Sequence, residues 1–152
     1  MTMNQRAPSL EEFLAYNGAH THRLWAVVAS DWECPVCYRT KFQILRWTTR
    51  FPRSPHAFKD WMAPLHKHHD HSVEFLSSGQ PRFSQTIICD QCNAADGAAK
   101  RKLKLPKNFS FSPIEIAAFV VAAPHNKHTI NYEMAYAIYL ALSMAGEGQT
   151  YG

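Results

Sequence analysis

Two C-x-x-C pairs are the clearest chemical feature of this sequence. All four cysteines of the 152-residue chain belong to them: Cys34, Cys37, Cys89 and Cys92. Two such pairs supply the four thiolates of a tetrahedral structural Zn²⁺ site. Disulfides are not expected, because the N-terminus lacks a secretory signal. We therefore predict one shared zinc site, with two separate redox motifs or inert buried thiols as the alternatives.

Fifty-one residues separate the two cysteine pairs, far more than in a simple zinc ribbon. A folded element must therefore lie inside the loop that the zinc closes. Zinc binding of this kind contributes on the order of 10 kcal/mol to folding, but it carries no catalysis by itself. A purely structural zinc module that binds nucleic acid is the plain alternative.

A histidine-rich segment, H-K-H-H-D-H, occupies positions 66–71. Alone, an exposed polar turn or a second structural metal site explains it as well as a functional site does. The second cysteine pair, however, runs on into Asn93 and Asp96 at the start of an expected helix. If the neighbouring strands pair, that helix start lies beside the histidines. One imidazole can then accept a proton from water, while another and the Asn93 carbonyl hold a divalent ion against a phosphate.

Positive charge is concentrated in two stretches that contain no acidic residue. The net charge is only +4, but eleven of the sixteen lysines and arginines lie within 34–59 or 97–113. Such concentrations attract polyanions, most often nucleic acid, by salt-sensitive binding. A solvated basic face is the alternative. The aromatic residues of the first stretch suit either base stacking or the core: Tyr38, Phe42, Trp47 and Phe51.

Helices are expected at both ends of the chain, with short strands between them. Capping boxes, S-x-x-E, begin the first helix at Ser9 and a later one at Ser112. The expected helices span 10–16, 22–30, 93–105, 113–123 and 131–144, the last ending before Gly146. The expected strands span 41–49 and 84–88, with another strand leading into the histidines and a turn over 77–81.

This order of elements predicts an α+β fold in a single domain. The expected parts are a helical N-terminal part (1–33), a zinc-bound core (34–107) and a helical C-terminal part (108–152). The composition, 46% hydrophobic and 18% charged, argues against an intrinsically disordered chain. No apolar run approaches the ~18 residues of a membrane span. We therefore expect a soluble, cytoplasmic protein without membrane association.

Three motifs make the sequence similar to a nuclease family. C-P-V-C at 34–37, H-x-H-H-D-H at 66–71 and C-D-Q-C-N-A-A-D-G at 89–97 resemble the HNH, or ββα-metal, nucleases. The closest resemblance is to the phage recombination endonuclease VII family, which cleaves Holliday junctions and other branched DNA. It covers 34–105, close to half the chain. It implies a zinc-stapled ββα-metal finger, a short β-hairpin plus a helix, with flanking N- and C-terminal helices.

The resemblance also implies site residues. The four cysteines become the Zn²⁺ ligands, and His69 becomes the general base that activates water. His68 and Asn93 become ligands of a catalytic ion, Mg²⁺ or Mn²⁺, supported by Asp96. The family usually has an aspartate where this chain has His68. An imidazole there tolerates Mn²⁺ better than Mg²⁺.

A rival register takes Asp70 as the metal ligand and His71 as the base, which keeps the family's Asp-His order. The first register is preferred because it also aligns the Asp-His pair that follows. The segment between Cys37 and His66 is longer than in the family. It is either a DNA-contacting element or a strand that pads the core.

The expected function is metal-dependent hydrolysis of DNA phosphodiester bonds, by a homodimer acting on branched or duplex DNA in a bacterial or phage-infected cell. Restriction-type or nicking cleavage of linear duplex, and a non-catalytic zinc-dependent DNA-binding module, are the alternatives. Six residues are expected to contact the DNA backbone: Arg46, Arg50, Arg53, Lys100, Arg101 and Lys104.

Overall fold

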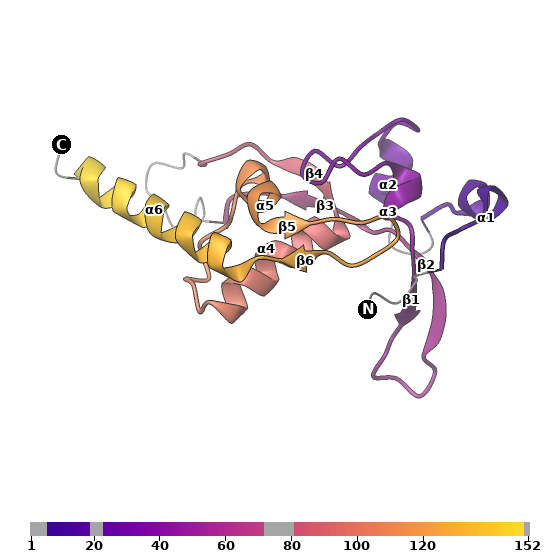
Figure 1. Cartoon of the computed structure of the whole chain (residues 1–152). Helices are drawn as coiled ribbons and strands as arrows, with labels where there is room; N and C mark the ends of the chain where they lie inside the picture. Colours follow the sequence, from indigo (N-terminus) through magenta and orange to yellow (C-terminus); the bar gives the residue numbers. More distant parts are fainter. Residues whose placement is uncertain (1–5, 19–22, 72–80, 151–152) are drawn as a thin grey trace.

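The structure of this chain, a computed structural model, describes residues 6–18, 23–71 and 81–150. These residues form six helices and three two-stranded antiparallel hairpins, an α+β fold (Figure 1). Of the turn expected over 77–81, all but Pro81 lies outside the described residues.

Two short helices, α1 (Leu10–Ala15) and α2 (Arg23–Val27), form the N-terminal part. The expected capping box is present at the start of α1, since the Glu12 amide donates to Ser9 Oγ and the Ser9 amide donates to the Glu12 carboxylate. In α2, Trp25 is buried. The indole attaches this part of the chain to the core.

The strand expected over 41–49 is wrong at its beginning. Residues Lys41–Ile44 form a short helix, α3, and β1 (Arg46–Arg50) starts only after it. The cause is local, because Thr40 and Gln43 cap each other across the first turn of α3. This second type of capping box ends in Gln rather than Glu.

The first hairpin joins β1 to β2 (Phe58–Met62). Trp47 lies opposite Trp61 in this ladder, with ring centroids 5.0 Å apart in an edge-to-face arrangement. The hairpin extends away from the helical part of the molecule (Figure 1). It forms the folded element that the long spacing between the cysteine pairs requires.

The second hairpin carries the histidines. Its strands, β3 (Leu65–His68) and β4 (Thr86–Cys89), are antiparallel, and helix α4 (Asp90–Lys102) begins directly after β4. The helix starts earlier than expected because Cys89 is its N-cap. It packs against both strands, so the three elements form one strand–strand–helix unit.

The C-terminal part is not purely helical, contrary to the expectation. Helix α5 (Pro113–Phe119) ends before the expected 123, because the chain becomes extended at Val120. A small hairpin of β5 (Val120–Val121) and β6 (Thr129–Ile130) follows.

The last helix, α6 (Tyr132–Thr150), is longer than expected and passes through Gly146. It packs against α5 near its start, where Ala135 is fully buried. Its later turns project from the molecule (Figure 1).

One buried cluster includes side chains from the N-terminal, central and C-terminal parts, among them Trp25, Leu45, Ile88, Phe111 and Phe119. Each large apolar side chain buried there contributes about 1.5–3 kcal/mol. Phe111 meets Phe119 edge to face, with ring centroids 4.9 Å apart. Within the described part of the chain, no helix has the length and apolar character needed to cross a membrane.

Candidate functional site

The two cysteine pairs converge on one point. The sulfurs of Cys34 and Cys92 are 3.7 Å apart, and those of Cys37 and Cys89 are 3.8 Å apart. All four lie within 4.8 Å of one another. Zinc–sulfur bonds of about 2.3 Å in a tetrahedron place sulfurs about 3.8 Å apart. The cluster could therefore hold a metal ion such as zinc.

Local backbone structure brings the sulfurs together. The first pair lies in a tight turn in which the Tyr38 amide donates to the Cys34 carbonyl at 2.8 Å. Tyr38 itself adopts the left-handed conformation (φ 61°) that closes this turn. The second pair occupies the N-cap and first turn of α4. The amide of Cys89 donates to the sulfur of Cys34 at 3.4 Å, which links the two halves.

Arg39 neutralises the cluster from one side. Its Nε donates to Cys37 Sγ at 3.3 Å and an Nη donates to Cys89 Sγ at 3.5 Å. The other Nη donates to the carbonyls of Ala123 and Asn126. Burial opposes the charge of the guanidinium, but the contacts with Cys37 and Cys89 raise the pKa of Arg39 above its ordinary value. Hydrogen bonds within the cluster lower the pKa of the Cys37 thiol.

His128 also contacts the cluster, at Cys92. Its Nε2 lies 3.2 Å from Cys92 Sγ, and its amide donates to the Gln91 side chain. Its Nδ1 is buried and has no hydrogen-bond partner. Sequence reasoning missed both His128 and Arg39. Only the position of Arg39, two residues after the first pair, could have suggested a role.

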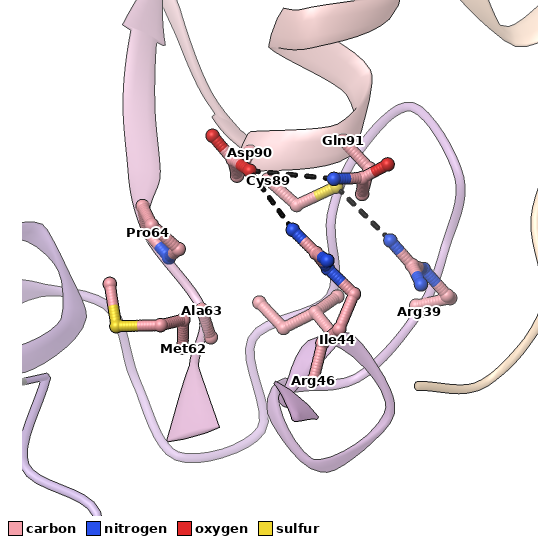
Figure 2. Close-up of a pocket in the computed structure, with 9 residues that line it drawn as sticks. All are labelled: Arg39, Ile44, Arg46, Met62, Ala63, Pro64, Cys89, Asp90 and Gln91. Atoms are coloured by element: carbon pink, nitrogen blue, oxygen red, sulfur yellow. Dashed lines mark hydrogen bonds and ion pairs between the residues drawn. The ribbon is translucent and has the colours of Figure 1, made fainter. Parts of the chain in front are cut away.

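Beside the cysteine cluster, the Asp90 carboxylate contacts His66 and Arg46. His66 Nε2 lies 3.1 Å from its carboxylate and Arg46 lies 3.9 Å from it. Figure 2 shows Arg46 and Gln91 directed at Asp90, with Arg39 directed at Cys89. Burial raises the pKa of Asp90, but the hydrogen bond from His66 and the nearby charges outweigh it and lower the pKa. Arg46 is therefore engaged inside the protein.

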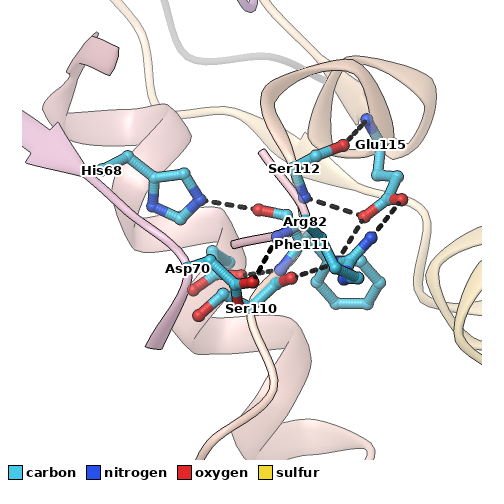
Figure 3. Close-up of polar contacts among 8 residues, drawn as sticks. His68, Asp70, Arg82, Ser110, Phe111, Ser112 and Glu115 are labelled. Atoms are coloured by element: carbon cyan, nitrogen blue, oxygen red, sulfur yellow. Dashed lines mark hydrogen bonds and ion pairs between the residues drawn. The ribbon is translucent and has the colours of Figure 1, made fainter. Parts of the chain in front are cut away.

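His68, at the end of β3, is buried, and one of its ring nitrogens is hydrogen-bonded. The residue is 2% exposed, and its Nε2 lies 2.6 Å from the carbonyl oxygen of Phe111 (Figure 3). A carbonyl only accepts, so Nε2 carries the hydrogen and Nδ1 remains the basic nitrogen. Histidines that bind metals typically donate their other N–H to such an acceptor. The ring also stacks on Phe83, with centroids 5.3 Å apart.

Asp96 binds the backbone amide of Phe111, the residue whose carbonyl contacts His68. Its Oδ1 accepts the Phe111 amide at 2.8 Å, and its Oδ2 lies 3.1 Å from Lys100 Nζ. Asp96 is 4% exposed. Both carboxylate oxygens are therefore engaged within the protein.

Asn93 lies on the same face of α4, one turn from Asp90 and one turn from Asp96. Asp90 contacts His66 of β3, whereas Asp96 shares Phe111 with His68. The half-buried Asn93 lies between these two residues along the helix. Within the part of the chain that the structure describes, no hydrogen bond engages the Asn93 side-chain oxygen.

His69 follows β3 directly and is exposed. Its Nδ1 lies 3.4 Å from the Lys67 carbonyl, a long contact that favours a hydrogen on Nδ1 and a basic Nε2. Its ring meets that of His71 edge to face, with centroids 4.4 Å apart. The strand end thus turns one histidine inward and the next outward.

The residues of the rival register are anchored to other segments. Asp70 is 2% exposed and accepts the Arg82 amide at 2.7 Å (Figure 3). His71 Nδ1 lies 3.0 Å from Ser110 Oγ. Burial, followed by the charge of Lys100, lowers the pKa of His71.

The six expected DNA contacts divide into two groups. Arg46, Arg50 and Lys100 form internal ion pairs with Asp90, Asp60 and Asp96. These three side chains therefore have carboxylate partners within the chain. The exposed group consists of Arg53, Arg101 and Lys104. Arg101 and Lys104 line a cleft of about 410 Å³ together with Lys100 and Lys107.

Comparison with known proteins does not add to this geometry. The chain matches no protein-family model, no curated protein and no solved structure. Among the described residues, the four cysteines are the one group of three or more His, Cys, Asp or Glu residues close enough to share a metal ion. The function has to be argued from the chemistry of the side chains.

Proposed function

We propose that this chain is a metal-dependent DNA endonuclease of the ββα-metal type, with His69 as the general base. The observation that carries the proposal is the difference between two adjacent histidines, His68 and His69, at the end of β3. His68 is buried with its Nε2 committed to a carbonyl, and His69 is exposed with a basic Nε2. A metal ligand needs a fixed tautomer, whereas a base needs access to water.

In this proposal a neutral His69 accepts a proton from water through Nε2 as the water oxygen attacks phosphorus. The Lys67 carbonyl holds the Nδ1 hydrogen and thereby orients the ring. As the new P–O bond forms, the bond from phosphorus to the 3′ oxygen breaks, and the departing oxygen takes a proton from solvent, which leaves a 5′ phosphate and a 3′ hydroxyl. A positioned histidine base contributes about 10²–10⁴-fold to such a reaction.

The chain's own donors for a catalytic ion are Nδ1 of His68 and the amide oxygen of Asn93. A bound divalent ion would stabilise negative charge on the phosphate. Asp96 cannot readily join, because Phe111 and Lys100 occupy its oxygens. Two neutral donors, one of them imidazole, suit Mn²⁺ better than Mg²⁺. The cysteine cluster, with Zn²⁺, would fix the start of α4 and hence Asn93.

We further propose branched DNA as the substrate and a homodimer as the active form. The exposed cations Arg53, Arg101 and Lys104 suit phosphate contacts. Helix α6 exposes apolar side chains that suit a subunit interface: Met134, Tyr136, Leu140 and Met144.

One observation favours a second candidate, a zinc-dependent DNA-binding module without catalysis. The buried carboxylates nearest the histidines, Asp70 and Asp96, both accept backbone amides. A catalytic Mg²⁺ site would ordinarily use such a carboxylate directly. In this second candidate the histidines are structural.

The test uses zinc-loaded protein and labelled four-way junction, linear duplex and single strand, each with Mg²⁺, with Mn²⁺ or with no added ion. Ion-dependent cutting that prefers the junction supports the proposal. Discrete fragments from linear duplex indicate a restriction-type or nicking enzyme. DNA retention without cutting in any ion overturns the nuclease and supports the binding module.

A further inference from the structure

The β1–β2 hairpin has a rigid base. Trp47 and Trp61 pack together across the ladder, and Trp61 is buried. The Arg6 guanidinium covers the Trp47 ring at 4.1 Å, and Glu12 accepts the indole hydrogen of Trp61. The hairpin is therefore a fixed projection of the molecule, with residues 51–57 connecting its strands at the far end (Figure 1).

Two aromatic rings are exposed at this far end. Phe51 is 58% exposed and Phe58 is 47% exposed, and their ring centroids are 6.2 Å apart. They lie side by side because Arg50 pairs with Phe58 in the ladder. Neither ring belongs to the buried core or to the residues packed on it.

The backbone fixes the position of Phe51. It adopts a left-handed conformation (φ 51°), which is unusual for a bulky residue. The Ser54 amide donates to the Phe51 carbonyl at 2.9 Å, and the Ala57 amide donates to Ser54 at 3.2 Å. Strained residues of this kind cluster at binding sites.

Basic side chains lie near the two rings. The Arg50 guanidinium lies 5.1 Å from the Phe51 centroid and 5.7 Å from that of Phe58. Arg50 itself pairs with Asp60 at 4.0 Å, so the exposed cations of this part of the hairpin are Arg53 and Lys59. An exposed aromatic pair framed by cations complements a polyanion that also presents flat apolar faces. Nucleic acid with accessible bases has both properties.

We propose that Phe51 and Phe58 form a stacking platform for unpaired bases, with Arg53 and Lys59 holding the neighbouring phosphates. Base–aromatic stacking tolerates any sequence, because every base has a π face. A fully paired duplex keeps its bases stacked internally and offers only phosphates. This inference rests on the proposed function and deepens it, since it specifies DNA with unpaired nucleotides, such as a branch point.

The test measures binding without added divalent ion, so that it does not depend on cleavage. The probes are fluorescein-labelled oligo-dT, a forked duplex and a fully paired duplex, followed by anisotropy. The double variant Phe51→Ala/Phe58→Ala is expected to lose about tenfold or more in affinity for oligo-dT and the fork. Its affinity for paired duplex is expected to change less than about twofold, because Arg53 and Lys59 remain.

Two further variants make the result specific. Phe51→Leu/Phe58→Leu keeps apolar surface but removes the π faces, so it should lose affinity as the alanine variant does. Ile114→Ala removes an 84% exposed apolar side chain elsewhere and should bind like wild type. Thermal unfolding of all variants should match wild type, since both rings are largely exposed.

Three results would overturn the platform: unchanged binding by the alanine variant, equal loss on paired duplex, or full retention by the leucine variant. The last would indicate an apolar docking surface for a protein instead. These outcomes are independent of cutting. A protein that binds unpaired DNA through the hairpin but never cleaves would contradict the proposed nuclease and leave the platform standing.

Discussion

The cysteine cluster and the histidine segment share the strand–strand–helix unit, but they are built in opposite ways. In the cluster, three of the four cysteines are fully buried, Arg39 and the Cys89 amide donate to the sulfurs, and His128 Nε2 contacts Cys92 Sγ. In the histidine segment, His68 is buried while His69 faces solvent. A structural metal site excludes water, whereas a hydrolytic site has to admit it.

The two regions also connect different parts of the chain. Around the cluster, Arg39 and His128 join the first cysteine turn and α4 to residues 123–128. Around the histidines, backbone and side-chain groups of 110–111 hold His68 and His71. Substitutions in the cluster should therefore destabilise the fold, whereas in the proposed nuclease a substitution of His69 should reduce cleavage without destabilising the fold.

Removing the metal should have the largest effect. A strong chelator, or Cys89→Ser, is expected to abolish cooperative unfolding, because structural zinc contributes on the order of 10 kcal/mol and most domains have only about 5–15 kcal/mol in total. Circular dichroism melting follows the fold and elemental analysis counts the zinc. Restoring the melt by adding Zn²⁺ is the control. A metal-free protein that melts like the untreated one contradicts the prediction.

Asp96→Ala should have the next largest effect. It leaves the Phe111 amide unsatisfied and Lys100 without its carboxylate partner, at an expected cost of about 3–5 kcal/mol. Urea unfolding measures the loss. The exposed Glu133→Ala on α6 is the matched control and should change stability by less than about 0.5 kcal/mol. Equal stabilities of the two variants would show that Asp96 is not a structural anchor.

Arg39→Ala tests the shell around the cysteine cluster. Loss of the two N–H groups directed at Cys37 and Cys89 should weaken zinc affinity by about 10–100-fold. Competition with a chromophoric chelator gives the affinity. Arg39→Lys should be intermediate, because ammonium keeps the charge but loses the planar fork. Arg53→Ala replaces an exposed arginine and should leave zinc affinity unchanged. An equal loss of affinity in both variants would contradict a role for the Arg39 contacts in zinc binding.

Asp70→Asn should have the smallest effect and separates the two registers. The amide oxygen can still accept the Arg82 amide, so stability should fall by less than about 1.5 kcal/mol. Cutting of four-way DNA should stay within about threefold of wild type, since His68 and His69 are untouched. If this substitution removes cutting while the protein stays folded, Asp70 and His71 form the site instead.

The sequence predicted the helix starts well where the signal lies within a single helical turn. The capping boxes at Ser9 and Ser112 start helices as expected. The helix at Lys41–Ile44 was mistaken for a strand, because its alternating apolar residues resemble one and its cap ends in Gln. The β5–β6 hairpin was missed because two-residue strands depend on pairing across the chain.

The distinction between local signals and contacts across the chain also applies to the site. The cysteine cluster was predictable because each pair is a local motif. His128 was not, since it reaches Cys92 from a distant part of the chain. Arg39 lies only two residues after Cys37, but its contacts with Cys89 and with the Ala123 carbonyl depend on the fold. A basic stretch that contains no acidic residue in the sequence can still have acidic side chains next to it in the folded protein. Asp60 and Asp90 reach Arg50 and Arg46 only through the fold.

The nuclease itself is tested most directly by comparing wild type with His69→Ala on a labelled four-way junction in Mn²⁺, with binding measured on the same samples. His56→Ala is the matched control, an exposed histidine outside the histidine segment. Cutting by His69→Ala should fall by at least about 100-fold, while junction binding and melting stay at wild-type values and His56→Ala cuts normally. Equal cutting by wild type and His69→Ala would contradict the assignment of His69 as the base.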